Sequence, residues 1–272
     1  MEIIISNTLF TGKVLKHLPK VDSTNNYAKD MIAKSSPIDG TVILADEQFA
    51  GRGQTGNIWQ SEAQKNLTFS IIYQTNFLKA TEQFWLNRAI SLGVKFAVSS
   101  MLSMQSVEKN CLLPTKKLLT TLIKWPNDIY VENKKIAGIL IENTIVGMHL
   151  KYSVIGIGLN VNQQNFPKSI NATSLSLILK EELNKNEFLN QLLASIEKYF
   201  LLLKEQKYER LKNEYLEHLF RYNETAFYKK DNEVFEGKII DVDAFGNLVV
   251  ETKNGSEISE EKFGFKEISF VI

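Results

Sequence analysis

Short runs of apolar and β-branched residues recur along the chain, and most are separated by only a few polar residues. Runs of this length, bounded by turn-forming residues, predict buried β-strands. Since few helical segments lie between them, we expect mixed or largely antiparallel strand pairing and not a doubly wound sheet. The expected strands are residues 14–18, 41–45, 66–73, 118–123, 135–142 and 154–162.

Three other segments have the periodicity of helices. Residues 82–104 carry a stripe of large apolar side chains, which we interpret as core. Residues 186–220 also have one apolar face, and we expect two helices there with a break near residues 205–207. A shorter helix follows Ser23, whose side-chain oxygen is expected to cap the first turn.

The last part of the chain returns to short strands. Residues 235–243 and 248–252 are strand-like, and an Asn254-Gly255 pair follows as a hairpin signal. Such closely spaced strands predict a small β-barrel packed on a larger domain. The expected domains are residues 1–222 and residues 223–272.

One polar sequence interrupts the predicted sheet at residues 123–129, Ile-Lys-Trp-Pro-Asn-Asp-Ile. A lysine at the mouth of a core strand must find an anion or lose its charge through desolvation. Pro126 removes a backbone donor and confines Trp125 to extended geometry. The segment therefore indicates a site for an anion and a ring, although a strand-terminal turn with a snorkelling Lys124 explains these residues equally well.

A glycine-rich loop follows the strand expected at residues 41–45. Gly51, Gly53 and Gly56 allow its backbone to approach a ligand closely, and Arg52 adds a permanent planar cation. The loop is not a Walker A motif, because no Gly-Lys-Ser/Thr follows, and it lacks dinucleotide-fingerprint spacing. Alone it is weak evidence for any particular ligand.

Composition excludes several classes of protein. A hydrophobic content of 44% with 23% charged residues is ordinary for a globular chain. A net charge of +1 provides no general attraction for DNA or anionic membranes, and no apolar run approaches the length of a membrane span. The single cysteine, Cys111, excludes an intrachain disulfide and fits a reducing compartment, so we expect a cytoplasmic protein. Three scattered histidines make a His/Cys metal site improbable.

The loop and the lysine motif together resemble the catalytic core of biotin protein ligases. Further motifs of that family follow in its order between residues 15 and 180, namely Asp22-Ser23-Thr24-Asn25, residues 135–142, residues 154–162 and Ala172-Thr173-Ser174-Leu175. The resemblance implies an α+β catalytic domain of the class II aminoacyl-tRNA synthetase and biotin ligase type. It also implies a small SH3-like barrel at the C-terminus.

The implied reaction has two steps. ATP activates biotin as biotinyl-5′-adenylate with release of pyrophosphate, and a lysine of a carboxylase's biotin carboxyl carrier domain then receives biotin. Magnesium is expected to accompany ATP, with Asp128 as its candidate protein ligand. Some family members carry an N-terminal DNA-binding domain. Only about 20 residues precede Asp22, so we expect a monofunctional ligase without operator binding.

The resemblance also implies roles for individual residues. Lys124 is the leading candidate to bridge the biotin carboxylate and the α-phosphate, with Arg52 and the loop amides holding oxygens. Asp128 and Asn127 are candidates to orient Lys124, although Asp128 is equally suited to capping the turn. The expected biotin contacts are Ser23, Thr24, Asn25, Gln48, Gly51, Arg52, Gly53, Gln54, Lys124, Trp125, Gly138, Gly156 and Gly158. The expected nucleotide contacts are Arg52, Trp59, Asn127, Asp128 and Asn160, and Trp59 is alternatively a core aromatic.

The loop departs from many relatives, which have more arginine where this chain has Gln54, Thr55 and Asn57. We expect the adenylate to be held less tightly as a result. Two other functions stay open from sequence: a lipoate or octanoyl ligase on the same scaffold, and a non-catalytic biotin or nucleotide sensor. A monomer and a homodimer paired through a sheet edge are both compatible with the sequence.

Overall fold

The computed structural model describes residues 3, 5–108, 119–168, 170–254 and 257–271. Its larger part is built on a seven-stranded sheet, in which β1 pairs with β2 in parallel and every other described pair is antiparallel. The expectation of a mixed, largely antiparallel sheet is confirmed. In spatial order the strands are β1 (Leu15–Val21), β2 (Thr41–Gln48), β3 (Leu67–Gln74), β7 (His149–Leu159), β6 (Lys134–Val146), β5 (Asp128–Val131) and β4 (Thr121–Lys124).

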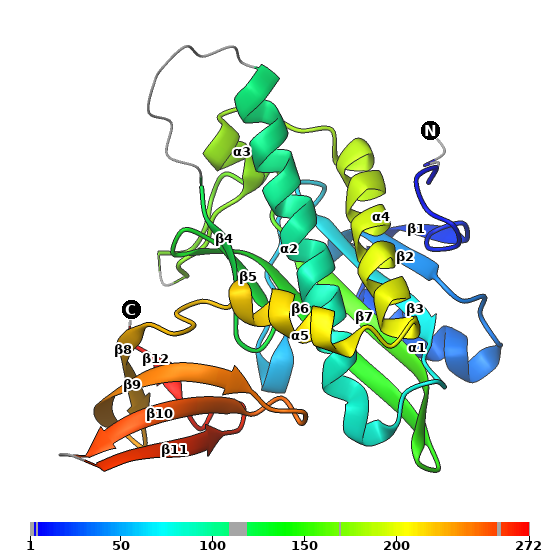
Figure 1. Ribbon diagram of the computed structural model, residues 1–272. Helices are drawn as coiled ribbons and strands as arrows, with labels where there is room; N and C mark the ends of the chain where they lie inside the picture. Colours follow the sequence, from blue (N-terminus) through cyan, green and yellow to red (C-terminus); the bar gives the residue numbers. More distant parts are fainter. Residues whose placement is uncertain (1–2, 4, 109–118, 169, 255–256, 272) are drawn as a thin grey trace.

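Helices cover both faces of this sheet (Figure 1). Alternate residues of β2 face opposite sides: Val42 and Leu44 pack into the main core, whereas Ile43 packs with Ala28 of α1 (Thr24–Lys34) on the other face. The main core lies under α2 (Gln83–Glu108) and α4 (Lys185–Lys204). The remaining helices are α5 (Tyr208–Glu217), α3 (Leu175–Leu179), and the 3-10 turns η1 (Gln54–Gly56) and η2 (Ala80–Glu82).

Most predicted elements are present, and the break in the C-terminal helical region lies between Lys204 and Tyr208, as expected. The predicted cap is wrong, because Ser23 stands at the N-cap position of α1 but its side chain makes no capping hydrogen bond. Strand β5, helix α3 and the strands at residues 225–230 and 269–270 were not predicted, and β4 begins later than residue 118. Residue 118, Cys111 and the Gly255-Ser256 part of the expected hairpin lie outside the described residues.

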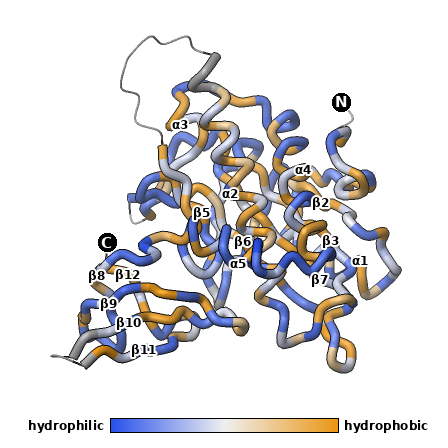
Figure 2. Tube along the Cα trace, viewed as in Figure 1, coloured by the Kyte–Doolittle hydropathy of each residue, from blue (hydrophilic) through white to orange (hydrophobic). Residues whose placement is uncertain are grey.

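The smaller part is a five-stranded antiparallel sheet, which confirms the predicted small β unit. Apolar stretches run along the strands of both sheets and along α2 (Figure 2). We retain the division at residues 222 and 223 as a proposal. In spatial order the strands are β11 (Glu257–Phe263), β10 (Leu248–Asn254), β9 (Glu233–Val242), β8 (Thr225–Lys230) and β12 (Ser269–Phe270).

The turn after β9 joins the small sheet to the large one. Arg88 of α2, only 1% exposed, donates to the carbonyls of Val242 (2.6 Å) and Asp243 (3.2 Å). Trp125 Nε1 donates to the carbonyl of Gly246 (2.9 Å). These bonds hold the small sheet beside the strand ends that carry the polar motifs. None of the described helices has the length and apolar character needed to span a membrane.

Candidate active site

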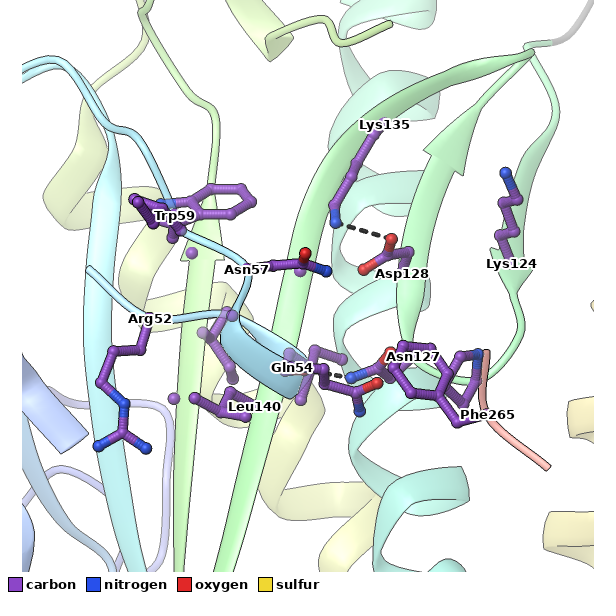
Figure 3. A pocket seen from close by; sticks show the side chains of 18 of the residues that line it. Arg52, Gln54, Asn57, Trp59, Lys124, Asn127, Asp128, Lys135, Leu140 and Phe265 are labelled. Atoms are coloured by element: carbon purple, nitrogen blue, oxygen red, sulfur yellow. Dashed lines mark hydrogen bonds and ion pairs between the residues drawn. The ribbon is translucent and has the colours of Figure 1, made fainter. Parts of the chain in front are cut away.

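A cavity of about 560 Å³ lies where the loop of residues 51–59, the ends of β4 to β7 and residues 265–270 of the small sheet meet (Figure 3). We call it the first cavity. Gly51 and Asn160 are not part of its lining, whereas all other expected site residues line it: Ser23, Thr24, Asn25, Gln48, Arg52, Gly53, Gln54, Trp59, Lys124, Trp125, Asn127, Asp128, Gly138, Gly156 and Gly158.

The glycine-rich loop is a small hairpin held by its own backbone. Trp59 N donates to Gly51 O (3.0 Å), and Gly53 N donates to Asn57 O (2.7 Å). A side chain at Gly51 would overlap the Trp59 carbonyl, so glycine is required there. Gly56 closes the turn at φ +81°, a conformation that favours glycine. The expectation that the Gly53 amide faces a ligand is wrong for this conformation, because that amide is used within the loop.

Arg52 is held by an acidic residue that the sequence analysis did not select. Its guanidinium makes an ion pair with Glu142 of β6, and Nη1 donates to Asn26 Oδ1 (2.6 Å). Lys29 also pairs with Glu142 (3.0 Å), and Asn25 Nδ2 donates to its other oxygen (2.8 Å). Burial alone would raise the pKa of Glu142, but hydrogen bonds from Asn25, Lys29 and Arg52 outweigh it and lower the pKa. Glu142 therefore remains ionised and fixes Arg52 at one side of the cavity.

A buried hydrogen-bond network lies under the same end of the cavity. The Thr24 amide (2.7 Å) and hydroxyl (3.0 Å) both donate to Gln48 Oε1. The Ser70 hydroxyl donates to Asn25 Oδ1 (2.6 Å) and lies 2.7 Å from the Thr24 hydroxyl. Ser23 is 2% exposed and lines the cavity beside them. Because these groups fix one another, the cavity presents polar atoms in set positions before any ligand arrives.

Two of the lysines that line the cavity, Lys135 and Lys124, have different surroundings. Lys135 Nζ lies 2.7 Å from Asp128 Oδ2, and the two side chains point toward each other (Figure 3). Lys124 Nζ instead lies over the rings of Tyr130 (4.9 Å) and Phe270 (5.0 Å). Burial lowers the pKa of Lys124, with Asp128 opposing the shift. The carboxylate expected to orient Lys124 thus makes its ion pair with Lys135, which the sequence analysis had not selected.

Trp59 and Asn25 fill the space above the glycines of β7. A side chain at Gly158 would overlap the Trp59 indole, and one at Gly156 would overlap the Asn25 amide. The sequence analysis expected Gly156 and Gly158 to contact biotin, and in this conformation protein side chains occupy the space beside both glycines. Trp59 Nε1 is buried and has no hydrogen-bond partner.

Trp59 also lines a second cavity of about 440 Å³, together with Lys135 and Asn160. Asn160 is 3% exposed, and its Nδ2 donates to Thr173 O (3.0 Å). Trp59 and Lys135 therefore line both cavities. This second cavity accounts for the position of Asn160 outside the lining of the first.

Trp125 and Asn127 have mainly structural contacts. Trp125 is 6% exposed, donates to Gly246 O, and lies 6.1 Å from the Phe265 ring, centroid to centroid. Asn127 Nδ2 donates to the carbonyl of Ile139 in β6. Among the described residues, no three His, Cys, Asp or Glu side chains are grouped to hold a metal ion, and Asp128 is the only carboxylate on the first cavity's described lining.

Comparison with known proteins places the chain in a family. Residues 18–160 match the model of the Biotin/lipoate A/B protein ligase family, and residues 228–271 match the Biotin protein ligase C terminal domain. The chain belongs to the biotin/lipoate A/B protein ligase family. The resemblance stated from the sequence motifs is confirmed, and so is the fold that it implied.

Members of this ligase family are similar over most of the chain. The bifunctional ligase/repressor BirA of Bacillus subtilis is 28% identical over 249 residues, covering 90% of this chain and 71% of the relative. The biotin–[acetyl-CoA-carboxylase] ligase of Mycobacterium tuberculosis is 29% identical, covering 68% of this chain and 65% of the relative. A structure of the Aquifex aeolicus biotin protein ligase in complex with biotin and ATP is 26% identical, has a TM-score of 0.71, and covers 94% of this chain and 98% of that one.

Several lining or supporting residues could not be identified from the sequence. Lys135 and Glu142 lie within a run that was interpreted only as strand. Ser70 and the segment 265–270 carried no motif, since their contribution depends on contacts with distant parts of the chain.

Proposed function

We propose that this ligase activates biotin with ATP as biotinyl-5′-adenylate and transfers it to a lysine in the biotin carrier domain of a carboxylase. One observation carries the proposal: a single cavity combines a buried, pre-set polar network with Arg52, Lys124 and Lys135. The neutral ring system of biotin, with its polar ureido edge, fits the network, and the carboxylate at the end of the biotin chain fits the cations. The family match and the similarity to a biotin- and ATP-bound ligase support this pairing.

The polar network is the proposed site of the biotin ring system. Both bonds from Thr24 go to Gln48 Oε1, so the donor remaining on that amide is Nε2. Ser23 and Thr24 supply hydroxyl groups, and Asn25 lies beside them. These groups can both donate to and accept from a ureido group, as a neutral cyclic urea requires.

Activation brings two anions together. A biotin carboxylate oxygen forms a bond to the α-phosphorus, and the bond from that phosphorus to the β-phosphate oxygen breaks to release pyrophosphate. Positive charge must therefore stand where the carboxylate and the α-phosphate meet. We propose Lys135 as the main cation at that point, because it projects toward Asp128 inside the cavity, while Lys124 contributes from over its aromatic rings.

The nucleotide is proposed to use both sides of Trp59. An adenine ring can stack on the indole, and Asn160 lies along the second cavity. Magnesium is treated as part of the MgATP substrate, with Asp128 as the available carboxylate. In the second step the amine of the acceptor lysine forms an amide bond with the biotinyl carbonyl, and AMP leaves.

The deciding experiment measures pyrophosphate release from ATP with biotin, with lipoate, or with neither, in the absence of acceptor protein. Biotin-dependent release, with the adenylate found on the enzyme, is expected. Release with lipoate alone would assign the chain to lipoate activation. Binding of biotin without release under either condition would favour a sensor and contradict the proposal.

A further inference from the structure

A turn of the small sheet forms part of the wall of the first cavity. Glu267 N donates to Gly264 O (3.1 Å), and Gly264 N donates to Glu267 Oε2 (2.6 Å), which closes the turn from both ends. Phe265 and Lys266, at the tip of this turn, both line the cavity. Lys266 therefore belongs to a segment that lines the cavity but is remote in sequence from every motif of the large domain.

The backbone of Lys266 has an unusual conformation. Its φ is +72°, in the left-handed region that glycine adopts readily and that lysine seldom adopts. Glycine is the usual residue at the third position of a turn with this geometry. A lysine kept in a glycine-favouring conformation, on the wall of a ligand cavity, suggests that its side chain serves the site.

The turn is held against the large domain. The Phe265 ring packs near Trp125, and the Phe270 ring lies under the Lys124 amine. The bond from Trp125 to Gly246 joins the two sheets next to these contacts. Lys266 is exposed at the cavity wall and does not depend on a large movement of the small sheet to reach it.

The charges around the cavity indicate what Lys266 would bind. The loop contributes neutral Gln54 and Asn57 to the lining, and Arg52 is its one cation there. A polyphosphate needs more positive charge than the loop supplies. We propose that Lys266 is a binding residue for the polyphosphate of the nucleotide, so that the small sheet adds a cation to the single one, Arg52, that the loop contributes to the lining. This inference rests on the proposed function.

The test compares Lys266→Gly and Lys266→Arg with the wild-type chain. Glycine removes the cation and suits the backbone, so the variant is expected to fold normally, which thermal unfolding checks. For Lys266→Gly we expect the KM for ATP and the directly titrated Kd for ATP to rise by about 3- to 10-fold, the range of one exposed charge contact. The KM for biotin should stay unchanged, and Lys266→Arg should retain most of the ATP affinity.

Lys229→Ala is the matched control, because it removes an exposed lysine from β8 of the same sheet that is not part of the cavity lining. Unchanged ATP affinity in Lys266→Gly, or an equal change in Lys229→Ala, would overturn the inference. A rise in the KM for biotin with no change for ATP would overturn it too. If the wild-type chain released no pyrophosphate, the proposed function would fail, whereas the comparison of ATP Kd values would still decide the role of Lys266.

Discussion

Lys135 and Asp128 form an ion pair that lines the first cavity, and each side chain is about one-third exposed or less. An anion that enters the cavity therefore meets the Lys135 ammonium group, which Asp128 already holds in one orientation. Lys124, in contrast, is held over two rings and has a pKa lowered by burial. Of the two lysines, Lys135 is therefore better placed to meet charge that develops during adenylation.

At the residue scale we predict that Lys135→Ala raises the adenylation barrier by ~2–4 kcal/mol, as expected for loss of a donor to the transition state. Lys124→Ala should slow the same step by less than about tenfold. Single-turnover pyrophosphate release measures both, and Lys134→Ala, the exposed neighbour, is the control. A larger loss in Lys124→Ala would return the bridging role to Lys124.

A second residue-scale prediction concerns the neutral loop. Gln54 lines the cavity, so Gln54→Arg adds a cation beside the bound adenylate. We expect the variant to slow adenylate dissociation by roughly tenfold, the effect of one charge-assisted hydrogen bond. Loss of labelled adenylate during gel filtration measures the rate. Gln74→Arg, exposed at the end of β3, adds the same charge away from the cavity. Equal dissociation rates in both variants would show that the number of cations in the loop does not control how long the adenylate stays bound.

At the scale of elements, β6 and β7 form the surface on which Trp59 rests. A side chain at Gly158 would overlap the indole, whereas one at Gly138 would come within 3.2 Å of its edge and could be accommodated by a small shift. We predict that Gly158→Ala displaces Trp59 and raises the KM for ATP by more than about tenfold, whereas Gly138→Ala has a several-fold smaller effect. Tryptophan fluorescence and ATP kinetics test this, and equal behaviour of the two variants would contradict it.

Helix α4 carries a buried carboxylate that fixes the N-terminal segment. Glu197, 4% exposed, accepts hydrogen bonds from the amides of Leu9 (2.6 Å), Phe10 (2.9 Å) and Thr11 (2.7 Å). Burial alone would raise the pKa of Glu197, but these backbone donors outweigh it and lower the pKa below its usual 4.5. The stabilisation is therefore fully present above that value and is lost as pH falls through the lowered pKa of the folded state.

We predict that Glu197→Gln lowers the free energy of unfolding by ~1–3 kcal/mol at neutral pH, since one charged acceptor of three amides becomes neutral. The difference from wild type should shrink as pH falls below 4.5 and the wild-type carboxylate takes up a proton. Urea unfolding over a series of pH values measures this. A difference that stays constant with pH would show that the ionised carboxylate is not the source of the stabilisation.

At the scale of the whole molecule, Arg88 ties the two sheets together. It lies against the Trp85 ring (4.3 Å) and donates to the turn after β9, so its removal leaves buried carbonyl groups without a donor. We predict that Arg88→Met lowers the free energy of unfolding by ~1.5–3 kcal/mol and also weakens ATP binding, because the small sheet supplies part of the cavity wall. Thermal unfolding and ATP titration test this.

Arg210→Met is the control for Arg88→Met. Arg210 is an exposed arginine of α5 that pairs with Glu214, and its loss should leave the free energy of unfolding nearly unchanged. If Arg88→Met destabilised the chain but left ATP affinity unchanged, the inference that docking of the small sheet supports ATP binding would be wrong.

The sequence predicted most of the longer strands, the main helices and most of the cavity lining, because periodicity and contiguous motifs carry that information. It could not predict which lysine meets Asp128, since that depends on the packing of β4, β5 and β6. Strand β5 is only four residues long and directly follows the Pro126-Asn127 turn, so no run of residues marked it. The wall formed by residues 265–270 depends on how the small sheet docks, which local patterns do not encode.

The ion pair between Arg52 and Glu142 has a consequence for how binding responds to ionic strength. Suppose that a ligand oxygen takes the place of Glu142 at the Arg52 guanidinium. The net gain in binding free energy is then the attraction of Arg52 for the ligand anion minus its attraction for the Glu142 carboxylate. Dissolved salt screens both attractions, so its effects partly cancel. An enzyme built in this way can bind an anion with an affinity that changes little between low and high salt concentration, whereas an arginine without such a partner would bind the anion more weakly as the salt concentration rises.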